Sequence, residues 1–113
     1  MTAPPRLLII DDEPQFRNML RRVFEGEGYT VTTAETGAIG LMRMKEASFP
    51  VVLCNVKLPD ANGVELTRAL RSIDPNTEVV VMTAFGSIPD AVQAMRNGAF
   101  QYLVKGDDNA KLL

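Results

Sequence analysis

The 113-residue chain contains no histidine and only one cysteine, Cys54. Without histidine, a Ser-His-Asp hydrolase, a Cys-His protease and the usual zinc sites all lose a necessary residue. A single cysteine cannot form an internal disulfide, and within an apolar run it is expected to be a small buried hydrophobe. The chemistry that remains is that of carboxylates, lysine and hydroxyl groups in a reducing compartment.

An excess of one charge and long hydrophobic runs are also missing. Twelve basic residues against fourteen acidic ones give a net charge of -2, so we expect no broad basic surface for nucleic acid or an anionic membrane. No apolar run approaches the roughly 18 residues of a membrane-spanning helix. Residues 1–6 lack the charged start and apolar stretch of a secretory signal. These absences predict a cytoplasmic protein.

The chain does have the composition of one globular domain, with 46% hydrophobic and 23% charged residues. We therefore expect residues 1–113 to form a single domain. Five short apolar runs are rich in valine, isoleucine and leucine without polar alternation, which is typical of parallel strands buried on both faces. The predicted strands are residues 6–10, 29–33, 50–55, 78–82 and 100–104.

The segments between these runs show helical periodicity. One stripe begins after Pro14, a second after Asn62 and a third after Ser87, which we expect to cap its helix; a weaker pattern covers residues 36–46. The stripes are Phe16, Met19, Leu20, Val23 and Phe24, then Leu66, Ala69, Leu70 and Ile73, then Ile88, Ala91, Val92 and Met95. Strands that alternate with helices predict an α/β fold with a central parallel sheet and helices on both faces.

The end of the chain leaves little room for another helix. Nine residues follow the last predicted strand, so a helix from about Asp107 is expected to be short or truncated beside the usual length of about 11 residues. We therefore expect the chain to be the N-terminal part of a longer protein.

Polar residues follow four of the predicted strands, at the edge of a parallel sheet where ligands bind. Adjacent carboxylates repel each other unless a cation neutralises them, and an oxygen-rich site open to water suits Mg²⁺. Lysine and threonine beside such an ion suit the oxygens of a phosphoryl group. The residues that close or directly follow these strands are Asp11, Asp12, Glu13, Asn55, Thr83, Ala84 and Lys105, all of them polar except Ala84.

Four motifs in order and spacing across residues 6–105 resemble the receiver domain of two-component response regulators. The third and fourth most resemble regulators of the nitrogen-regulatory type that activate sigma-54 transcription. The motifs are Asp11-Asp12-Glu13, residues 56–66 with Pro59 and Gly63, residues 82–88 around Thr83, and residues 98–105 with Tyr102 and Lys105.

The resemblance implies a flavodoxin-like fold with five parallel strands in the order 2-1-3-4-5. It implies a regulatory domain rather than an enzyme, with a sensor histidine kinase as partner and an output domain that this chain lacks. Magnesium would be held by Asp11, Asp12, position 55 and the backbone carbonyl of Lys57.

The resemblance also implies a set of switch residues. Thr83, next to Ala84, would bond a phosphoryl oxygen, Lys105 would pair with that group, and Tyr102 would swing inward when the site is occupied. The ion, the lysine and the threonine would together stabilise an in-line transfer.

The acceptor position departs from the family, because Asn55 stands where aspartate is expected. A carboxamide cannot form the acyl phosphate that a carboxylate forms, so Asn55 should block aspartyl phosphorylation and hold the inactive state. Asp11, Asp12 and Lys105 sum to -1, whereas an aspartate at position 55 would make the sum -2. Mg²⁺ is thus expected to bind more weakly, and the metal-free fold is expected to gain stability if Asn55 finds a donor such as Lys105.

A second departure is Gly106, where the family usually has proline after its lysine. Glycine allows more conformations than proline, which puts the placement of Lys105 in question. Two explanations stay open: Asn55 is a laboratory substitution in a working receiver, or the chain is a natural receiver that has lost its acceptor. The second would be a phosphorylation-independent pseudo-receiver that acts through protein–protein interaction.

Enzyme and carrier functions remain as rivals on this fold. A magnesium phosphohydrolase with Asp11 as nucleophile is disfavoured because that class separates its two acids by one residue. A flavin carrier is disfavoured because an acidic mouth repels the flavin phosphate.

Two surfaces have open interpretations. Arg17, Arg21 and Arg22 belong either to a solvated helix face or to a kinase-docking surface. Phe85 and Ile88 either pack in the core or, with Tyr102, leave an apolar surface for a partner or for a second copy in a homodimer.

Overall fold

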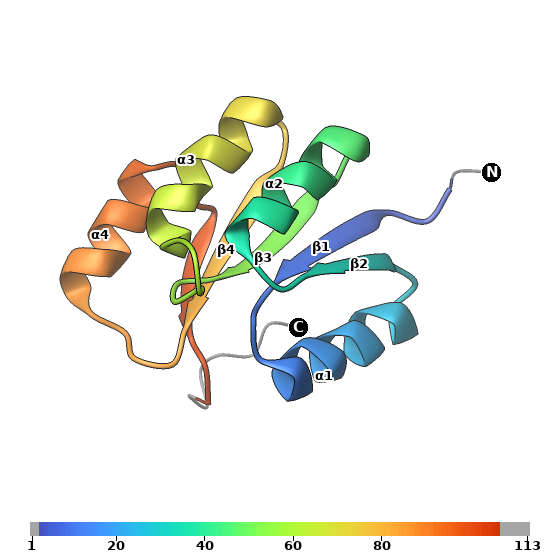
Figure 1. Cartoon of the computed structure of the whole chain (residues 1–113), viewed down its shortest axis with the longest axis horizontal. Coiled ribbons are helices and arrows are strands. Elements are labelled where there is room, and N and C mark those ends of the chain that lie inside the picture. The colour runs from blue at the N-terminus through green and yellow to red at the C-terminus, as the bar shows by residue number, and fades with distance from the viewer. Residues whose placement is uncertain (1–2, 107–113) are drawn as a thin grey trace.

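The computed structural model describes residues 3–106 and shows strands alternating with helices (Figure 1). The strands are β1 (Arg6–Ile10), β2 (Thr30–Ala34), β3 (Val51–Asn55), β4 (Glu78–Thr83) and β5 (Gln101–Val104). The helices are α1 (Pro14–Gly26), α2 (Gly37–Glu46), α3 (Gly63–Ile73) and α4 (Ile88–Arg96). The predicted alternation is confirmed, and β2 to β5 differ from the prediction by one residue at an end or at both ends. The expected last helix from about Asp107 lies outside the described residues.

The strands form one parallel sheet in the order β2-β1-β3-β4-β5. Helix α1 covers one face of this sheet, and α2, α3 and α4 cover the other (Figure 1). The predicted α/β fold, strand order and two-sided helix cover are confirmed over residues 3–106. None of the helices in this part of the chain is long and apolar enough to cross a membrane.

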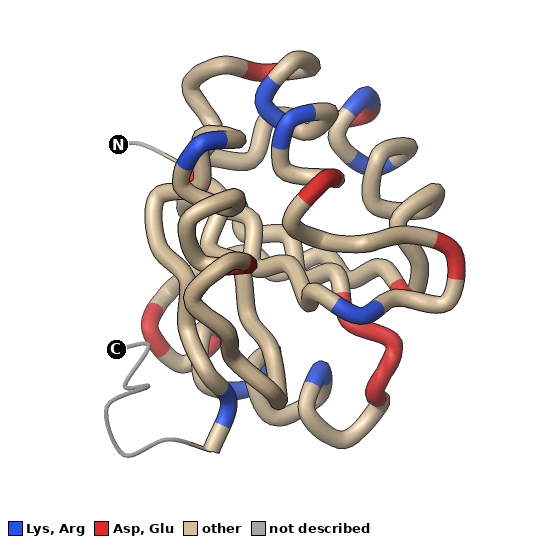
Figure 2. Tube along the Cα trace, turned by 90° about the vertical axis from the view of Figure 1, so that its left-hand side faces the viewer, with Lys and Arg blue, Asp and Glu red and all other residues tan. Residues whose placement is uncertain are grey.

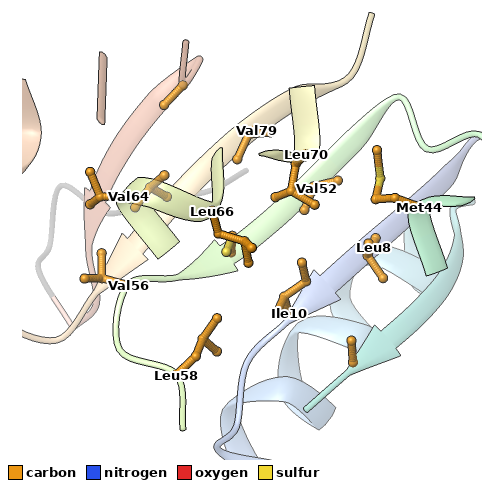
Figure 3. Packing of buried hydrophobic residues seen from close by; sticks show 14 of the residues in the cluster. Leu8, Ile10, Met44, Val52, Val56, Leu58, Val64, Leu66, Leu70 and Val79 are labelled. Carbon is orange, nitrogen blue, oxygen red and sulfur yellow. The ribbon is translucent and has the colours of Figure 1, made fainter. Parts of the chain in front are cut away.

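The core lies on both faces of the sheet because consecutive residues of β1 point to opposite sides. Leu8 and Ile10 belong to the cluster under α2 and α3, whereas Leu7 and Ile9 belong to the cluster under α1. Figure 3 shows the first cluster, in which strand residues such as Leu8 and Ile10 pack with Val52, Met44 and Leu70. This burial on both faces explains why the strand runs lack polar alternation.

Side-chain caps set the starts of the three helices on the α2–α4 face. The oxygen of Thr36 accepts from the Ile39 N–H at 3.1 Å, and that of Asn62 accepts from the Val64 N–H at 2.8 Å. The predicted cap at Ser87 is confirmed, because its hydroxyl oxygen accepts from the Asp90 N–H at 3.2 Å. Each cap satisfies a backbone donor that the first turn leaves free.

The large residues of the apolar stripe on α4 face outward rather than toward the core. Ile88, Val92 and Met95 are 81%, 45% and 50% exposed, and Ala94 is the residue that α4 buries completely. A small side chain lets the helix lie close to its neighbours, so the larger residues are left on the outer side. The alternative of core packing for Ile88 is therefore excluded, because periodicity identifies a face without saying which way it turns.

Candidate functional site

The carboxyl ends of β1, β3, β4 and β5 surround a pocket of about 840 Å³. The structure brings most of the predicted site residues to this pocket, and Asp11 lies beneath it, bonded to Lys105. The acidic run at residues 11–13 is the continuous red segment of the trace in Figure 2. The predicted residues that line the pocket are Asp12, Asn55, Lys57, Thr83, Ala84 and Lys105.

Asp11 is fully buried, and both of its carboxylate oxygens have partners. One oxygen (Oδ1) accepts from the Glu13 N–H at 2.9 Å, and the other (Oδ2) accepts from the Lys105 ammonium at 2.8 Å. The Lys105 side chain is only 14% exposed, and its nitrogen lies 4.1 Å from the centre of the Phe16 ring. A cation over an aromatic face is attracted by the ring electrons, so Phe16 helps to hold the lysine.

Asn55 bonds its own loop rather than Lys105. Its amide nitrogen donates to the backbone carbonyl of Lys57 at 2.7 Å. The opposite amide orientation would place two acceptor oxygens against each other, so chemistry fixes the nitrogen on this side. Lys105 is thus not a donor to Asn55, because the lysine is bonded to Asp11 instead.

The β4–α4 connection holds the switch residues in local hydrogen bonds. Thr83 is buried, and its hydroxyl accepts from the Phe85 N–H at 3.2 Å. The Tyr102 hydroxyl accepts from the Ser87 N–H at 3.2 Å and does not line the pocket. Phe85, next to Ala84, is 88% exposed at the rim, so its alternative of core packing is excluded.

Asp60 is a residue of the site loop that the sequence did not single out. Its carboxylate accepts from the N–H groups of Gly37 and Ala38 at 2.8 and 3.0 Å, which fastens the loop after β3 to the start of α2. These two backbone hydrogen bonds lower the pKa of Asp60 because they favour its charged form. The contact joins residues more than twenty positions apart, and no local sequence signal indicates it.

Arg17 is also placed differently from the prediction of an open helix face. Its side chain is 12% exposed, donates to the Asp11 backbone carbonyl at 2.8 Å and lies 3.7 Å from Glu35. Arg21 and Arg22 are exposed on α1, as expected of either a solvated face or a docking surface.

The backbone of Gly106, directly after Lys105, has a conformation that proline cannot adopt. Its φ is 76°, in the left-handed region, whereas proline fixes φ near -65°. The backbone of Gly106 therefore takes a turn that the family's usual proline would forbid.

Two of the four groups expected to bind magnesium are already engaged by protein donors. Asp11 is bonded to Lys105 and Glu13, and the Lys57 carbonyl is bonded to Asn55. Asp12 is exposed at the pocket. Within residues 3–106, no group of three or more histidine, cysteine, aspartate or glutamate side chains is arranged for a metal ion. As arranged, these residues do not fit a divalent cation.

The family of the chain is shown by its match to a known domain. Residues 7–113 match the response regulator receiver domain. The chain belongs to this family. It is thus a receiver domain of two-component signalling rather than an enzyme.

The receiver domain is similar to a part of several transcriptional regulators. It is 36% identical over 109 residues to the transcriptional regulatory protein GlrR of Escherichia coli K12, which covers 96% of this chain and 24% of GlrR. It is 36% identical over 108 residues to the regulatory protein AtoC of the same organism, covering 96% of this chain and 23% of AtoC. The chain thus spans about a quarter of the length of these relatives.

Solved receiver domains superpose closely on this chain. The beryllofluoride-activated NtrC4 receiver domain dimer has a TM-score of 0.85 and 35% identity, covering 90% of this chain and 84% of that one. The Thermotoga maritima regulator TrrA, solved in complex with Mg²⁺ and beryllofluoride, has a TM-score of 0.83 and 26% identity, covering 96% and 92%. Magnesium is thus a ligand of at least one receiver of this fold.

Proposed function

We propose that this chain is a receiver module that cannot be phosphorylated at its acceptor position and acts by protein association in the unphosphorylated, inactive state. The observation that carries the proposal is Asn55, which ends β3 with its amide 2.7 Å from the Lys57 carbonyl. The amide nitrogen has no free lone pair and its oxygen carries no full negative charge, so no acyl phosphate forms there.

Weak magnesium binding belongs to the same proposal. The sequence places a neutral amide where a carboxylate would add a third negative charge, and the local donors already occupy Asp11 and the Lys57 carbonyl. Mg²⁺ relies on carboxylate oxygens for most of its affinity in proteins. The assignments of Asp11, Asp12, Thr83 and Lys105 to metal and phosphoryl contacts rest on the family motif.

We further propose that the receiver is the N-terminal part of a longer cytoplasmic regulator of transcription. The relatives are regulators about four times as long as the matched region, and two motifs resemble the sigma-54 activator type. A sensor histidine kinase would be the partner of the receiver, and the output domain would lie outside this chain.

A homodimer is supported by the outer side of α4. Ile88, Val92 and Met95 expose apolar surface there, and apolar surface of this kind is typical of association sites. The NtrC4 receiver relative is itself described as a dimer.

The second candidate is a natural pseudo-receiver whose association does not depend on phosphate at all. Gly106 favours it, because a glycine with φ of 76° replaces the family's proline in addition to the change at position 55. A laboratory substitution at one position would leave this second departure unexplained.

The test compares this chain with Asn55→Asp in Mg²⁺ and beryllofluoride, with amide NMR shifts of residues 83–88 as the readout. Asn62→Asp is the matched control, because it adds the same charge in the same pocket and aspartate also caps a helix. We expect only Asn55→Asp to change its spectrum. No response from either chain would favour the pseudo-receiver.

Acetyl phosphate labelling gives the complementary measurement. We expect no phosphoryl group on this chain after incubation with Mg²⁺ and acetyl phosphate, as read by intact mass. A stable or hydrolysing phosphoryl adduct on the unaltered chain would refute the proposed function.

A further inference from the structure

The pocket contains a protein cation next to its most buried carboxylate. Lys105 Nζ lies 2.8 Å from Asp11 Oδ2, and the exposures of the two side chains are 14% and 0%. Shielded charges at hydrogen-bond distance interact far more strongly than an exposed pair, because solvent screens them less. Among the ion pairs within residues 3–106, this pair is the most shielded from solvent.

Lys105 is held from several sides, so it is not a mobile surface lysine. Its ammonium lies over the Phe16 ring, and its backbone N–H donates to the Thr83 carbonyl at 2.7 Å. Asp11 is fixed as well, since its backbone carbonyl accepts from Arg17 at 2.8 Å. Both members of the ion pair are pre-positioned by contacts outside the pair.

We propose that Lys105 is the resident cation of this pocket, so that a divalent cation reaches Asp11 only by displacing the lysine. The inference rests on the proposed function, in which position 55 is neutral and supplies no carboxylate to draw the lysine away. Lysine then limits magnesium binding directly, in addition to the charge lost at position 55.

A simpler alternative is that any positive charge near the pocket repels Mg²⁺. Lys57 separates the two accounts, because its side chain is exposed at the same pocket and its charge is equal to that of Lys105. General repulsion predicts similar effects on removing either lysine. Displacement predicts an effect for Lys105 alone, since it is the lysine bonded to Asp11.

The experiment measures Mg²⁺ binding by isothermal titration calorimetry for this chain, Lys105→Met and Lys57→Met, without beryllofluoride. We expect Lys105→Met to bind Mg²⁺ at least about tenfold more tightly than this chain, because the unpaired buried carboxylate of Asp11 gains a partner. Lys57→Met is expected to change the affinity by about twofold or less, because its exposed charge is screened. Equal tightening in both variants, or no tightening in Lys105→Met, would overturn the inference.

Thermal unfolding gives a second readout. Lys105→Met is expected to melt below this chain in EDTA and to recover part of that loss in Mg²⁺, whereas this chain should show little change. A variant whose melting temperature does not respond to Mg²⁺ contradicts the inference.

Phe16→Leu covers the case in which Lys105→Met does not fold. Leucine keeps most of the apolar volume but removes the ring face, which loosens the lysine. Mg²⁺ binding should then tighten by about twofold to fivefold, and unchanged binding would overturn the inference. Asn55 is present in all these proteins, so unchanged Mg²⁺ binding in the variants would overturn the inference and leave the proposed function intact. Conversely, acetyl phosphate labelling of this chain would refute the proposed function without altering the Mg²⁺ titration.

Discussion

Replacing Gly63 by alanine should be one of the most damaging small changes to this domain. Gly63 begins α3, and a Cβ there would lie 2.2 Å from the Asn55 carbonyl oxygen and 2.8 Å from the carbon of the same group. Both atoms are backbone, and the end of β3 is paired with β4, since the Val56 N–H donates to the Met82 carbonyl at 2.7 Å. The obstacle therefore cannot rotate away as a side chain would.

The magnitude follows from what must move. Ordinary contacts of this kind are beyond 3.0 Å, so α3 must withdraw, which breaks or stretches the Gly63 N–H bond to the Val56 carbonyl of 2.7 Å. Overpacking costs about 1–3 kcal/mol and the weakened hydrogen bond about 1 kcal/mol, while alanine returns about 1 kcal/mol of helix propensity. The net destabilisation is about 1–3 kcal/mol, or about 5–15 °C in Tm for a domain of this size.

Gly26→Ala is the matched control, because Gly26 is also helical and nothing lies within 4 Å of the Cβ it would gain. Like Gly63→Ala, it reduces the conformational entropy of the unfolded chain, so it should be neutral or stabilising by up to about 1 kcal/mol. Urea and thermal unfolding of the two variants give the comparison. A Gly63→Ala melting temperature within about 3 °C of the control, less than 1 kcal/mol, would refute the steric reasoning.

Four further predictions address other contacts. Burial raises the pKa of Cys54 to about 12 from 9.0, so a thiol reagent should label Cys54 only when the protein unfolds, and labelling of folded protein at pH 8 would contradict this. The free energy of unfolding should fall between pH 9.0 and about 12, because the thiol ionises in the unfolded chain before it does so in the folded protein. The lowered pKa of Asp60 means that its contribution is present above pH 3.8 and lost as the pH falls through the folded value, so Asp60→Asn should lose that part of the acid dependence of urea unfolding. Asn97→Ala should lower stability by about 1–2 kcal/mol, because it frees the Val64 carbonyl, which the Asn97 amide contacts at 2.8 Å; an unchanged urea midpoint would count against this contact. Gly106→Ala meets no atoms within 4 Å but must adopt φ of 76°, so it should cost about 1–2 kcal/mol by backbone conformation alone, and a neutral result would argue against that turn.

The alternation of strands and helices was predictable because local chemistry agrees with the tertiary structure. All four of the apolar residues in β1 are buried, so the residues on both faces of the strand are apolar and form a continuous apolar run in the sequence. They are Leu7, Leu8, Ile9 and Ile10. Ser87 is a cap whose signal is local. In α4 the local signal was ambiguous, since a stripe of large apolar residues and a set of small alanines give overlapping periodicities.

The position of the site was predictable, but its internal bonds were not. Parallel strands deliver their carboxyl ends to one edge, so Asn55, Thr83 and Lys105 converge whatever their contacts. Which oxygen Lys105 bonds depends on the last ångström of packing, including the Phe16 ring from α1. The Asp60 contact with α2 depends on the approach of two distant segments.

These bonds change the meaning of the asparagine at position 55. If charge alone mattered, restoring aspartate would return a third carboxylate and nothing else. In the structure, Asn55 also holds the Lys57 carbonyl, and Lys105 is bonded to Asp11. Asn55→Asp would release the Lys57 carbonyl and at the same time offer Lys105 a second carboxylate. The gain in Mg²⁺-binding free energy in that variant should therefore exceed the sum of two separate gains, one from Lys105→Met and one from a charge change elsewhere in the pocket. Additive binding free energies would mean that the Asn55–Lys57 and Lys105–Asp11 contacts act independently, and that position 55 acts through charge alone.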